Sequence, residues 1–239
     1  MPAPLADATW TSIPPKPLVL VPVGSIEQHG PHLPLDTDTA IAVAVATRVA
    51  THLGGDVLVA PPVSYGSSGE HQSFAGTSSI GSEALQLFTI ELVRSMSTWA
   101  GRIVFVNAHG GNVAALAKAT FQLATEGHDV AWAACATETV DLHAGFTETS
   151  LMLHIRPESV RLDLAEAGDT RSLPTILPLM MAGGIAAVSP NGVLGDPAGA
   201  SAEHGAQVLE TMAADIADLV LHGTADVRGM LRARPRASA

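Results

Sequence analysis

Short apolar runs rich in β-branched residues alternate along this chain with longer segments of helical period. Four runs, each expected to form a buried strand, lie at residues 18–23, 56–61, 102–107 and 129–136. Helices are expected between and after them, at residues 39–53, 82–99, 112–126 and 148–155. Strands that alternate with helices pair in parallel and carry helices on both faces of the sheet. The sequence therefore predicts an α/β fold with three αβα layers and a mostly parallel central sheet.

The chain length and the later segments fit one domain with a tail. At 239 residues and 47% apolar content the chain can bury one large core, and we expect a single domain over residues 1–224. Between 156 and 200 the pattern breaks at prolines and glycines, with a short helix expected at 173–182; this region is interpreted as a cap or a subunit contact. A last helix is expected at 202–221. Small and basic residues near the end favour a disordered tail over 225–239.

Charge and cysteine content exclude several classes of protein. Twelve Lys and Arg against 23 Asp and Glu leave a net charge of −11, so we expect no nucleic-acid partner. The single cysteine, Cys135, cannot form an internal disulfide and is interpreted as a buried strand thiol. The sequence has no secretory signal pattern and no apolar run of the about 18 residues that a membrane span needs. We therefore expect a cytoplasmic protein without a membrane partner.

The densest group of metal-ligating side chains follows the first expected strand. Residues 27–38 read EQHGPHLPLDTD and contain two histidines and three carboxylates. Imidazole and carboxylate are ligands that Zn, Mn and Fe(II) accept, and two such ions about 3.5–4 Å apart can share one carboxylate. Open α/β sheets place their chemistry at the carboxyl ends of the strands. This segment therefore predicts a metal site at that edge of the sheet.

Three later loops carry groups of the same chemical kind. Glu70 and His71 lie in a glycine-rich loop after the second expected strand, and His109 follows the third. His143 and Glu148 come after the fourth strand, close to the start of a helix. Because parallel strands bring their carboxyl-end loops to one edge of the sheet, we expect these side chains to converge on one site.

Each of these residues also has an ordinary structural interpretation. A lone histidine in a glycine-rich loop, such as His109, more often hydrogen-bonds the backbone than binds a metal. Glu148 alone fits a carboxylate favoured at a helix start, and Glu70 with His71 fits a polar loop. Further histidines are interpreted as surface residues at positions 52, 128, 204 and 222, and as a packed helix residue at position 154. Convergence of the loops is what favours a metal site over these interpretations.

Four motifs together resemble those of the creatininase family of metal-dependent amidohydrolases. They are EQHGPHLP with a following Asp, GEH with FxGT, NxHGGN and HAGxxETS, and the resemblance extends from about residue 18 to 222. It implies a creatininase-like fold and two divalent metal ions per subunit, with Zn and Fe(II) expected and Mn also compatible. It also implies a closed homo-oligomer.

The resemblance assigns candidate metal ligands. The residues that match the family's ligands are Glu27, His29, Asp38 and His109. Glu27 and His29 would bind one ion each, and Asp38 would bridge both. The family takes a further ligand from a glutamate at the position of Gly111, so the second ion lacks one ligand here. We expect Glu148 to replace it.

The reaction implied by the resemblance is amide hydrolysis by an activated water. His143 matches the histidine that moves protons between this water and the leaving nitrogen, and Glu148 is the second expected catalytic residue. Glu70, His71 and Gly110 are expected to contact the substrate. Within the family the chain most resembles peptidases that release a modified C-terminal dipeptide from a ribosomal precursor peptide, on the way to the redox cofactor mycofactocin. A modified precursor peptide is thus the expected partner.

Two alternatives stay open. The substrate could be a small cyclic amide or a formamide, as elsewhere in the family, although creatinine is disfavoured because its stacking aromatic has no clear counterpart after the fourth strand. The chain could also be a metal-binding scaffold without turnover. Loss of a metal ligand or of the proton-moving histidine would favour the scaffold, and the sequence keeps the matching residues.

Overall fold

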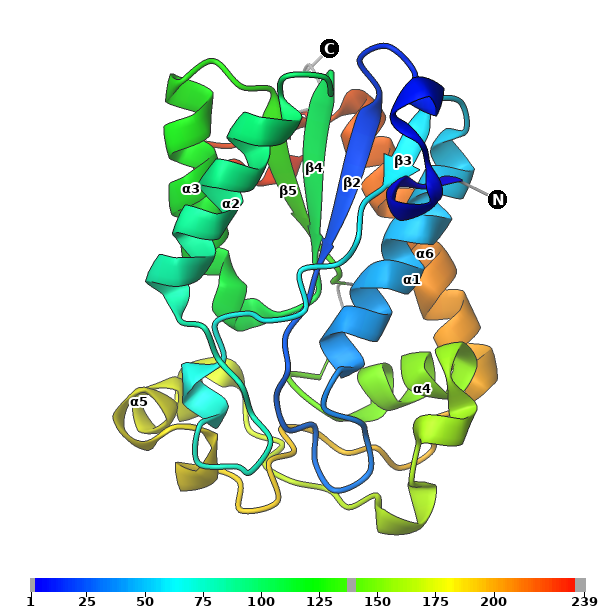
Figure 1. The fold of residues 1–239 in the computed structure, drawn as a ribbon. Coiled ribbons are helices and arrows are strands. Elements are labelled where there is room, and N and C mark those ends of the chain that lie inside the picture. The colour runs from blue at the N-terminus through cyan, green and yellow to red at the C-terminus, as the bar shows by residue number, and fades with distance from the viewer. Residues whose placement is uncertain (1–2, 137–140, 235–239) are drawn as a thin grey trace, which may run out of the picture.

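The computed structural model describes residues 3–136 and 141–234 and has a parallel sheet at its centre (Figure 1). The five strands are β1 (Ala3–Pro4), β2 (Leu18–Val23), β3 (Val57–Val59), β4 (Arg102–Asn107) and β5 (Val130–Ala134). Their order in the sheet is β1-β3-β2-β4-β5, and every neighbouring pair is parallel. The four expected strands are confirmed, although β3 and β5 are shorter than predicted. The two-residue strand β1 is too short to leave a period in the sequence.

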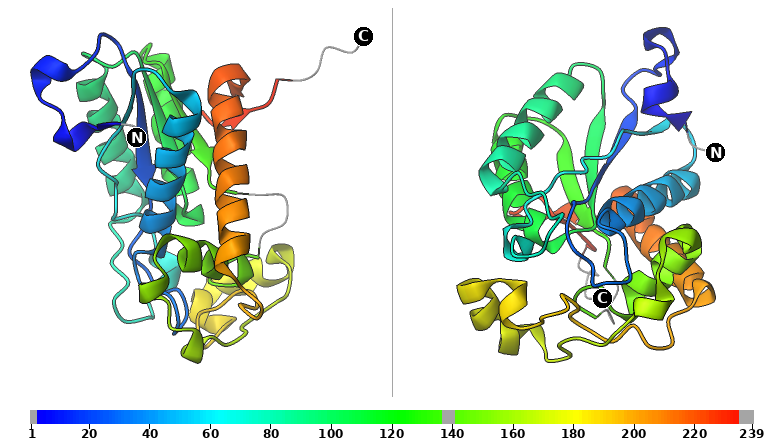
Figure 2. Two further views of the ribbon diagram at one scale, coloured as in Figure 1. Left: turned by 90° about the vertical axis from the view of Figure 1, so that its right-hand side faces the viewer. Right: turned by 60° about the horizontal axis from the view of Figure 1, so that its bottom comes forward.

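Helices cover both faces of this sheet. They are α1 (Thr37–Leu53), α2 (Ser82–Met96), α3 (Val113–Thr125), α4 (Phe146–Ile155), α5 (Leu173–Gly183) and α6 (Ala202–His222). Figures 1 and 2 show α2 and α3 on one face of the sheet and α1 and α6 on the other, which confirms the three-layer αβα arrangement. Helix α1 begins two residues earlier than predicted. That difference places Asp38 in its first turn.

The core consists of two apolar layers separated by the sheet. Val19 and Phe105 point to the layer that contains α2 and α3, where they pack with residues such as Leu116. Leu20 and Val104 point to the opposite layer, with α1 and α6. Successive side chains of a strand alternate between faces, so a strand buried on both sides is apolar throughout. This burial fixes the strand ends, and with them the loops that follow.

The segment after α6 corrects one prediction. Residues 225–239 are predicted to be disordered, but β6 (Thr224–Ala225) and β7 (Leu231–Arg232) form an antiparallel hairpin. Leu231 is buried, and the backbone N–H of Trp132 donates to Gly229 O at 2.9 Å. The buried Leu231 and the backbone contact to β5 hold this hairpin in place. Neither can be inferred from the small and basic residues of the segment. Residues 235–239, the rest of the predicted tail, lie outside the described residues.

The carboxyl ends of the strands meet the segment between α4 and α6. In Figure 1 this end of the sheet lies at the bottom, next to α4 and α5. Helix α5 confirms the short helix predicted at 173–182, and it contacts the 3-10 helix Gly69–His71 that follows β3. Among the described helices, none has the length and apolarity needed to cross a membrane. The segment 156–200 thus borders the edge where the candidate ligands are expected.

Candidate metal centre

The predicted ligands come together at the carboxyl ends of the strands. Four loops and two helix starts deliver seven side chains to one buried cluster, namely Glu27, His29, Asp38, His71, His109, His143 and Glu148. All except Glu148 are buried, and its side chain is 21% exposed. Convergence of parallel strands explains why residues up to 121 positions apart in sequence meet here.

Three of these residues form a group suited to one ion. One ligand atom each from Glu27, Asp38 and His109 lies within 4.8 Å of the others. His109 Nδ1 is 3.2 Å from Glu27 Oε1 and 3.3 Å from Asp38 Oδ2. Two carboxylates and an imidazole form a donor set that Zn, Mn and Fe(II) all accept.

A second group lies on the other side of Asp38. One ligand atom each from His29, His143 and Glu148 lies within 4.8 Å of the others, and His29 Nε2 is 3.8 Å from Glu148 Oε2. Asp38 Oδ1 is 3.1 Å from the same His29 nitrogen, whereas Oδ2 faces His109. The two oxygens of Asp38 therefore point to different groups, which is the arrangement of a bridging carboxylate.

Glu27 fits a cation site for a separate reason. Its side chain is 0% exposed, and none of the described residues makes a hydrogen bond to Oε1 or Oε2. A buried carboxylate without hydrogen-bond donors loses its hydration, which costs several kcal/mol unless a nearby positive charge compensates. A bound cation would remove that cost. The residues present thus fit a metal ion on an observation that is independent of any motif.

The cluster alternates negative and positive groups. Burial and the charge of Asp38 oppose ionisation of Glu27, yet His109 holds the pKa of Glu27 at about 2. Burial also opposes the charge on Asp38, but His29 and His109 hold its pKa well below the usual range. Burial disfavours the charged form of His29, and Asp38 nevertheless raises its pKa to about 10. Without metal, the protonated imidazoles supply the positive charge that the carboxylates require.

Gln28, which the sequence analysis did not single out, orients two further histidines. Its Oε1 accepts from Gly30 N at 2.8 Å, so its amide nitrogen faces Gly192 O at 3.0 Å and His71 Nδ1 at 2.9 Å. These partners assign the remaining proton of His71 to Nε2. The backbone oxygen of Gln28 accepts from His143 Nε2 at 2.8 Å. His143 therefore turns an unprotonated Nδ1 toward Glu27, 3.8 Å from Oε1.

Burial keeps both of these histidines neutral. It lowers the pKa of His71 to about 4 and holds the pKa of His143 well below its usual range. A neutral imidazole with a free Nδ1 can take up a proton or bind a metal. Further supports that the motifs did not indicate are the Ser25 hydroxyl, which donates to Asp38 Oδ2 at 2.7 Å, and the His32–Thr149 hydrogen bond of 2.9 Å.

The backbone at Gly111 leaves no room for an acidic side chain. A Cβ atom there would overlap Ser67 O and His109 Nε2 and would lie 2.7 Å from Glu70 Oε1. Glu148 instead extends from the first turn of α4 toward His29, and Ala144 N donates to its Oε2 at 2.6 Å. Burial raises the pKa of Glu148 to about 7. A carboxylate held in this way can change its protonation state near neutral pH.

A cavity of about 350 Å³ opens over the cluster. Glu70, His71 and Gly110, for which substrate contacts are predicted, line it together with residues of α5. Burial raises the pKa of Glu70, which is 3.8 Å from His109 Nε2. Among the cavities formed by the described residues, this one contains Glu27 from the loop after β2 and His109 from the loop after β4.

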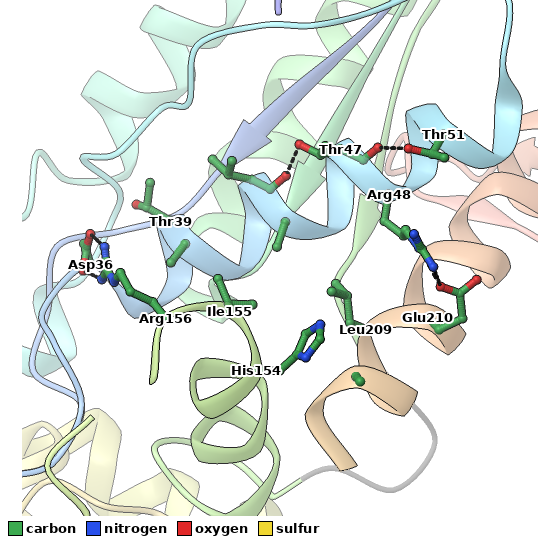
Figure 3. Close-up of a pocket in the computed structure, with 14 residues that line it drawn as sticks. Asp36, Thr39, Thr47, Arg48, Thr51, His154, Ile155, Arg156, Leu209 and Glu210 are labelled. Atoms are coloured by element: carbon green, nitrogen blue, oxygen red, sulfur yellow. Dashed lines mark hydrogen bonds and ion pairs between the residues drawn. The ribbon is translucent and has the colours of Figure 1, made fainter. Parts of the chain in front are cut away.

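A larger cavity of about 830 Å³ lies between α1, α4 and α6 (Figure 3). Its side chains include the Arg48–Glu210 ion pair of 2.6 Å, and none of the candidate ligands lines it. His154, predicted to be a packed helix residue, is exposed and lines this cavity, because its position on α4 faces away from the sheet. His52 forms an exposed ion pair with Glu210, which agrees with its surface interpretation.

Comparison with known proteins establishes the family. The family model described as "Creatinine amidohydrolase" matches residues 6–220. The chain belongs to the creatininase family. This membership and the structural match confirm the creatininase-like α/β fold and show that the chain is a hydrolase of amide bonds.

Individual members of the creatininase family match most of the chain. A relative from Mycobacterium ulcerans (strain Agy99), named mycofactocin precursor peptide peptidase, is 52% identical over 231 residues, which cover 94% of this chain and 90% of the relative. The creatinine amidohydrolase of Pseudomonas putida is 29% identical over 243 residues, covering 85% and 88% of the two chains. A structure titled "Creatininase Mn" superposes with a TM-score of 0.74 at 26% identity, over 92% of this chain and 98% of that one.

Proposed function

We propose that this chain is a metal-dependent peptidase that cleaves a modified ribosomal precursor peptide and releases its modified C-terminal dipeptide in mycofactocin biosynthesis. The name of the relative at 52% identity supports the precursor peptide as substrate. The observation that carries the metal-dependent chemistry is the buried Glu27 carboxylate, which no described residue hydrogen-bonds and which lies within 4 Å of three histidines. We further propose a cytoplasmic homo-oligomer.

Two divalent ions per chain are proposed, held by two sets of ligands that share Asp38. Glu27 and His109 complete the first set, and His29 and Glu148 complete the second. Zn and Fe(II) suit these mixed nitrogen and oxygen donors, and Mn does so as well. Such ions, when bound, lower the pKa of water and polarise the scissile carbonyl.

The chain's own side chains position the substrate and move protons. His143 is neutral and turns Nδ1 toward the cluster, so it can take a proton from the attacking water and deliver it to the leaving nitrogen. Its Nε2–H stays bonded to Gln28 O, which keeps the ring in this orientation. Glu70, His71 and Gly110 line the cavity where the peptide backbone would lie. Release of the amine then regenerates the neutral imidazole.

A small amide remains the second candidate substrate, because the relative from Pseudomonas putida is named creatinine amidohydrolase. Higher identity to the precursor peptide peptidase favours the peptide. A scaffold without turnover is disfavoured, since His143 and every proposed ligand are present and lie together.

The deciding experiment combines metal analysis with mass spectrometry. The purified protein is loaded with Zn(II), Fe(II) or Mn(II) and incubated with a modified precursor peptide, with its unmodified form and with creatinine. We expect two ions per chain and release of a C-terminal dipeptide from the modified peptide. The Glu27→Gln variant should lose the first ion and turnover, whereas the control Glu83→Gln, at an exposed position on α2, should keep both. Cleavage of creatinine alone would contradict the proposal.

A further inference from the structure

The cavity over the candidate metal centre is lined by two chemically different sets of residues. The polar set consists of candidate ligands and Glu70, with the backbone of Gly110 and Gly111. The apolar set, which we call the apolar wall, consists of Leu142, Leu173, Leu177, Met180, Ile185 and Leu194, three of them from α5. A ligand that fills the cavity must therefore present a polar part to the first set and an apolar part to the apolar wall.

Helix α5 is built to present that wall. Leu173, Leu177 and Met180 are spaced by four and three residues, so they lie on one face of the helix. Ile176 is 0% exposed and packs with Ile185 and Leu194, which anchors the helix to the rest of the protein. The wall therefore has a fixed position relative to the ligands.

The wall leaves apolar surface uncovered. Leu173 is 41% exposed and Leu177 is 42% exposed, although both border a cavity rather than the outer surface alone. When a ligand covers apolar area that faces water, the free energy of binding becomes more favourable by about 25 cal/mol per Å². A charged group in the same place would lose hydration against leucine side chains without a partner. The cavity thus selects an uncharged, apolar group.

We propose that α5 forms an apolar specificity subsite, in which Leu173, Leu177 and Met180 hold a bulky apolar side chain of the substrate next to the scissile amide bond. The inference rests on the proposed function, which places that bond at the metal centre. It adds a recognition element that the shared motifs do not contain, since α5 lies outside all four of them.

Peptide selectivity gives the first test. Two series of synthetic peptides of equal length carry Leu, Ala or Lys at the residue before or the residue after the cleaved bond, and kcat/KM is measured by mass spectrometry. We expect the wild-type protein to prefer Leu over Ala by about tenfold or more in the series whose varied side chain reaches α5. Leu177→Ala should remove most of that preference, and Leu177→Glu should improve the Lys peptide relative to Leu. The matched control is Leu179, which is 47% exposed on the same helix but does not line the cavity.

A binding test separates this inference from the peptidase proposal. Leucine hydroxamate and glycine hydroxamate carry the same metal-binding group and differ only in the side chain, and calorimetry with the metal-loaded protein compares them. We expect a preference for leucine hydroxamate that Leu177→Ala and Met180→Ala reduce and Leu179→Ala leaves unchanged. If no peptide is cleaved but this pattern holds, the peptidase proposal fails and the subsite stands. Equal effects of Leu177→Ala and Leu179→Ala, or no effect of either, would overturn the subsite.

Discussion

Asp38 Oδ1 lies 3.1 Å from His29 Nε2, and both side chains are buried, His29 in the loop after β2 and Asp38 in the first turn of α1. The other oxygen of Asp38 accepts from Ser25 and faces His109. The carboxylate of Asp38 therefore faces both groups of candidate ligands. The first turn of α1 fixes the backbone from which this side chain extends, because Asp38 occupies the second position of that helix.

This geometry predicts unequal losses of metal. Asp38→Ala should remove a ligand from both ions at once, so we expect less than one tightly bound ion per chain. His29→Ala should mainly empty the second site and leave about one ion, since the first set of ligands is intact. Metal content per chain, measured on dialysed protein, checks both values, with the exposed Asp56→Ala as control. Two retained ions and normal turnover in Asp38→Ala would show that the binuclear assignment is wrong.

The structure also shows which parts of the fold and of the candidate site the sequence could predict. Strand and helix positions followed from periodicity because the sheet is buried on both faces, and the convergence of Glu27 with His109 followed from parallel strand order. The role of Gln28 could not be predicted, because a glutamine in a loop has no pattern and its partner Gly192 is 164 residues away. The hairpin at Leu231 was missed for a similar reason, since a two-residue strand has too few positions to show alternation.

The second prediction concerns Glu148, which we propose as the substitute for the glutamate that the family has at the position of Gly111. Glu148→Gln keeps the side-chain shape and removes the charge 3.8 Å from His29, so we expect loss of the second ion and of turnover. Glu70→Gln is the matched comparison, because Glu70 also borders the cavity but belongs to neither group of ligand atoms. It should keep both ions. The assignment fails if Glu70→Gln loses the second ion and Glu148→Gln retains it.

The third prediction concerns protons released by metal binding. In the metal-free protein Asp38 raises the pKa of His29 against burial to about 10, and Glu27 with Asp38 raises that of His109 well above its ordinary value. His29 therefore carries a proton at pH 7.5, and the raised pKa of His109 favours its protonated form as well, so binding two ions should release at least the proton of His29. Calorimetry in buffers of different ionisation enthalpy measures the number of protons released. Metal affinity should rise with pH, and pH-independent affinity would contradict the charge assignment.

The same shift makes the metal-free protein sensitive to alkali. The pKa of His29 is raised in the folded state from 6.5 to about 10, so its stabilising contribution is complete below pH 6.5 and is lost as the pH rises toward 10. We expect the melting temperature of the metal-free protein to fall over this range. The metal-loaded protein should not share this loss, because its imidazoles bind metal instead of protons.

Leu231 tests the correction made to the predicted tail. This side chain is 1% exposed and packs against the layer that contains α6, so Leu231→Ala should lower the free energy of unfolding by about 2–5 kcal/mol. Arg232→Ala is the control, because its side chain is 59% exposed and its ion pair with Asp226 is on the surface. Chemical denaturation of the metal-loaded proteins compares the two. Equal stability of Leu231→Ala and the wild type would mean that residues 225–234 do not contribute to the fold.

The last prediction separates proton transfer from metal binding at His143. Its Nε2–H is bonded to Gln28 O at 2.8 Å and its Nδ1 faces Glu27, so either role is geometrically open. If His143 moves protons, His143→Asn should keep both ions and lower kcat by about 10²–10⁴-fold with a much smaller change in KM, because only a general acid–base group is removed. Metal content and steady-state kinetics on the same sample measure both quantities. Loss of an ion in His143→Asn would make His143 a ligand, and an unchanged kcat would assign proton transfer to Glu70, to His71 or to solvent, since both side chains line the cavity.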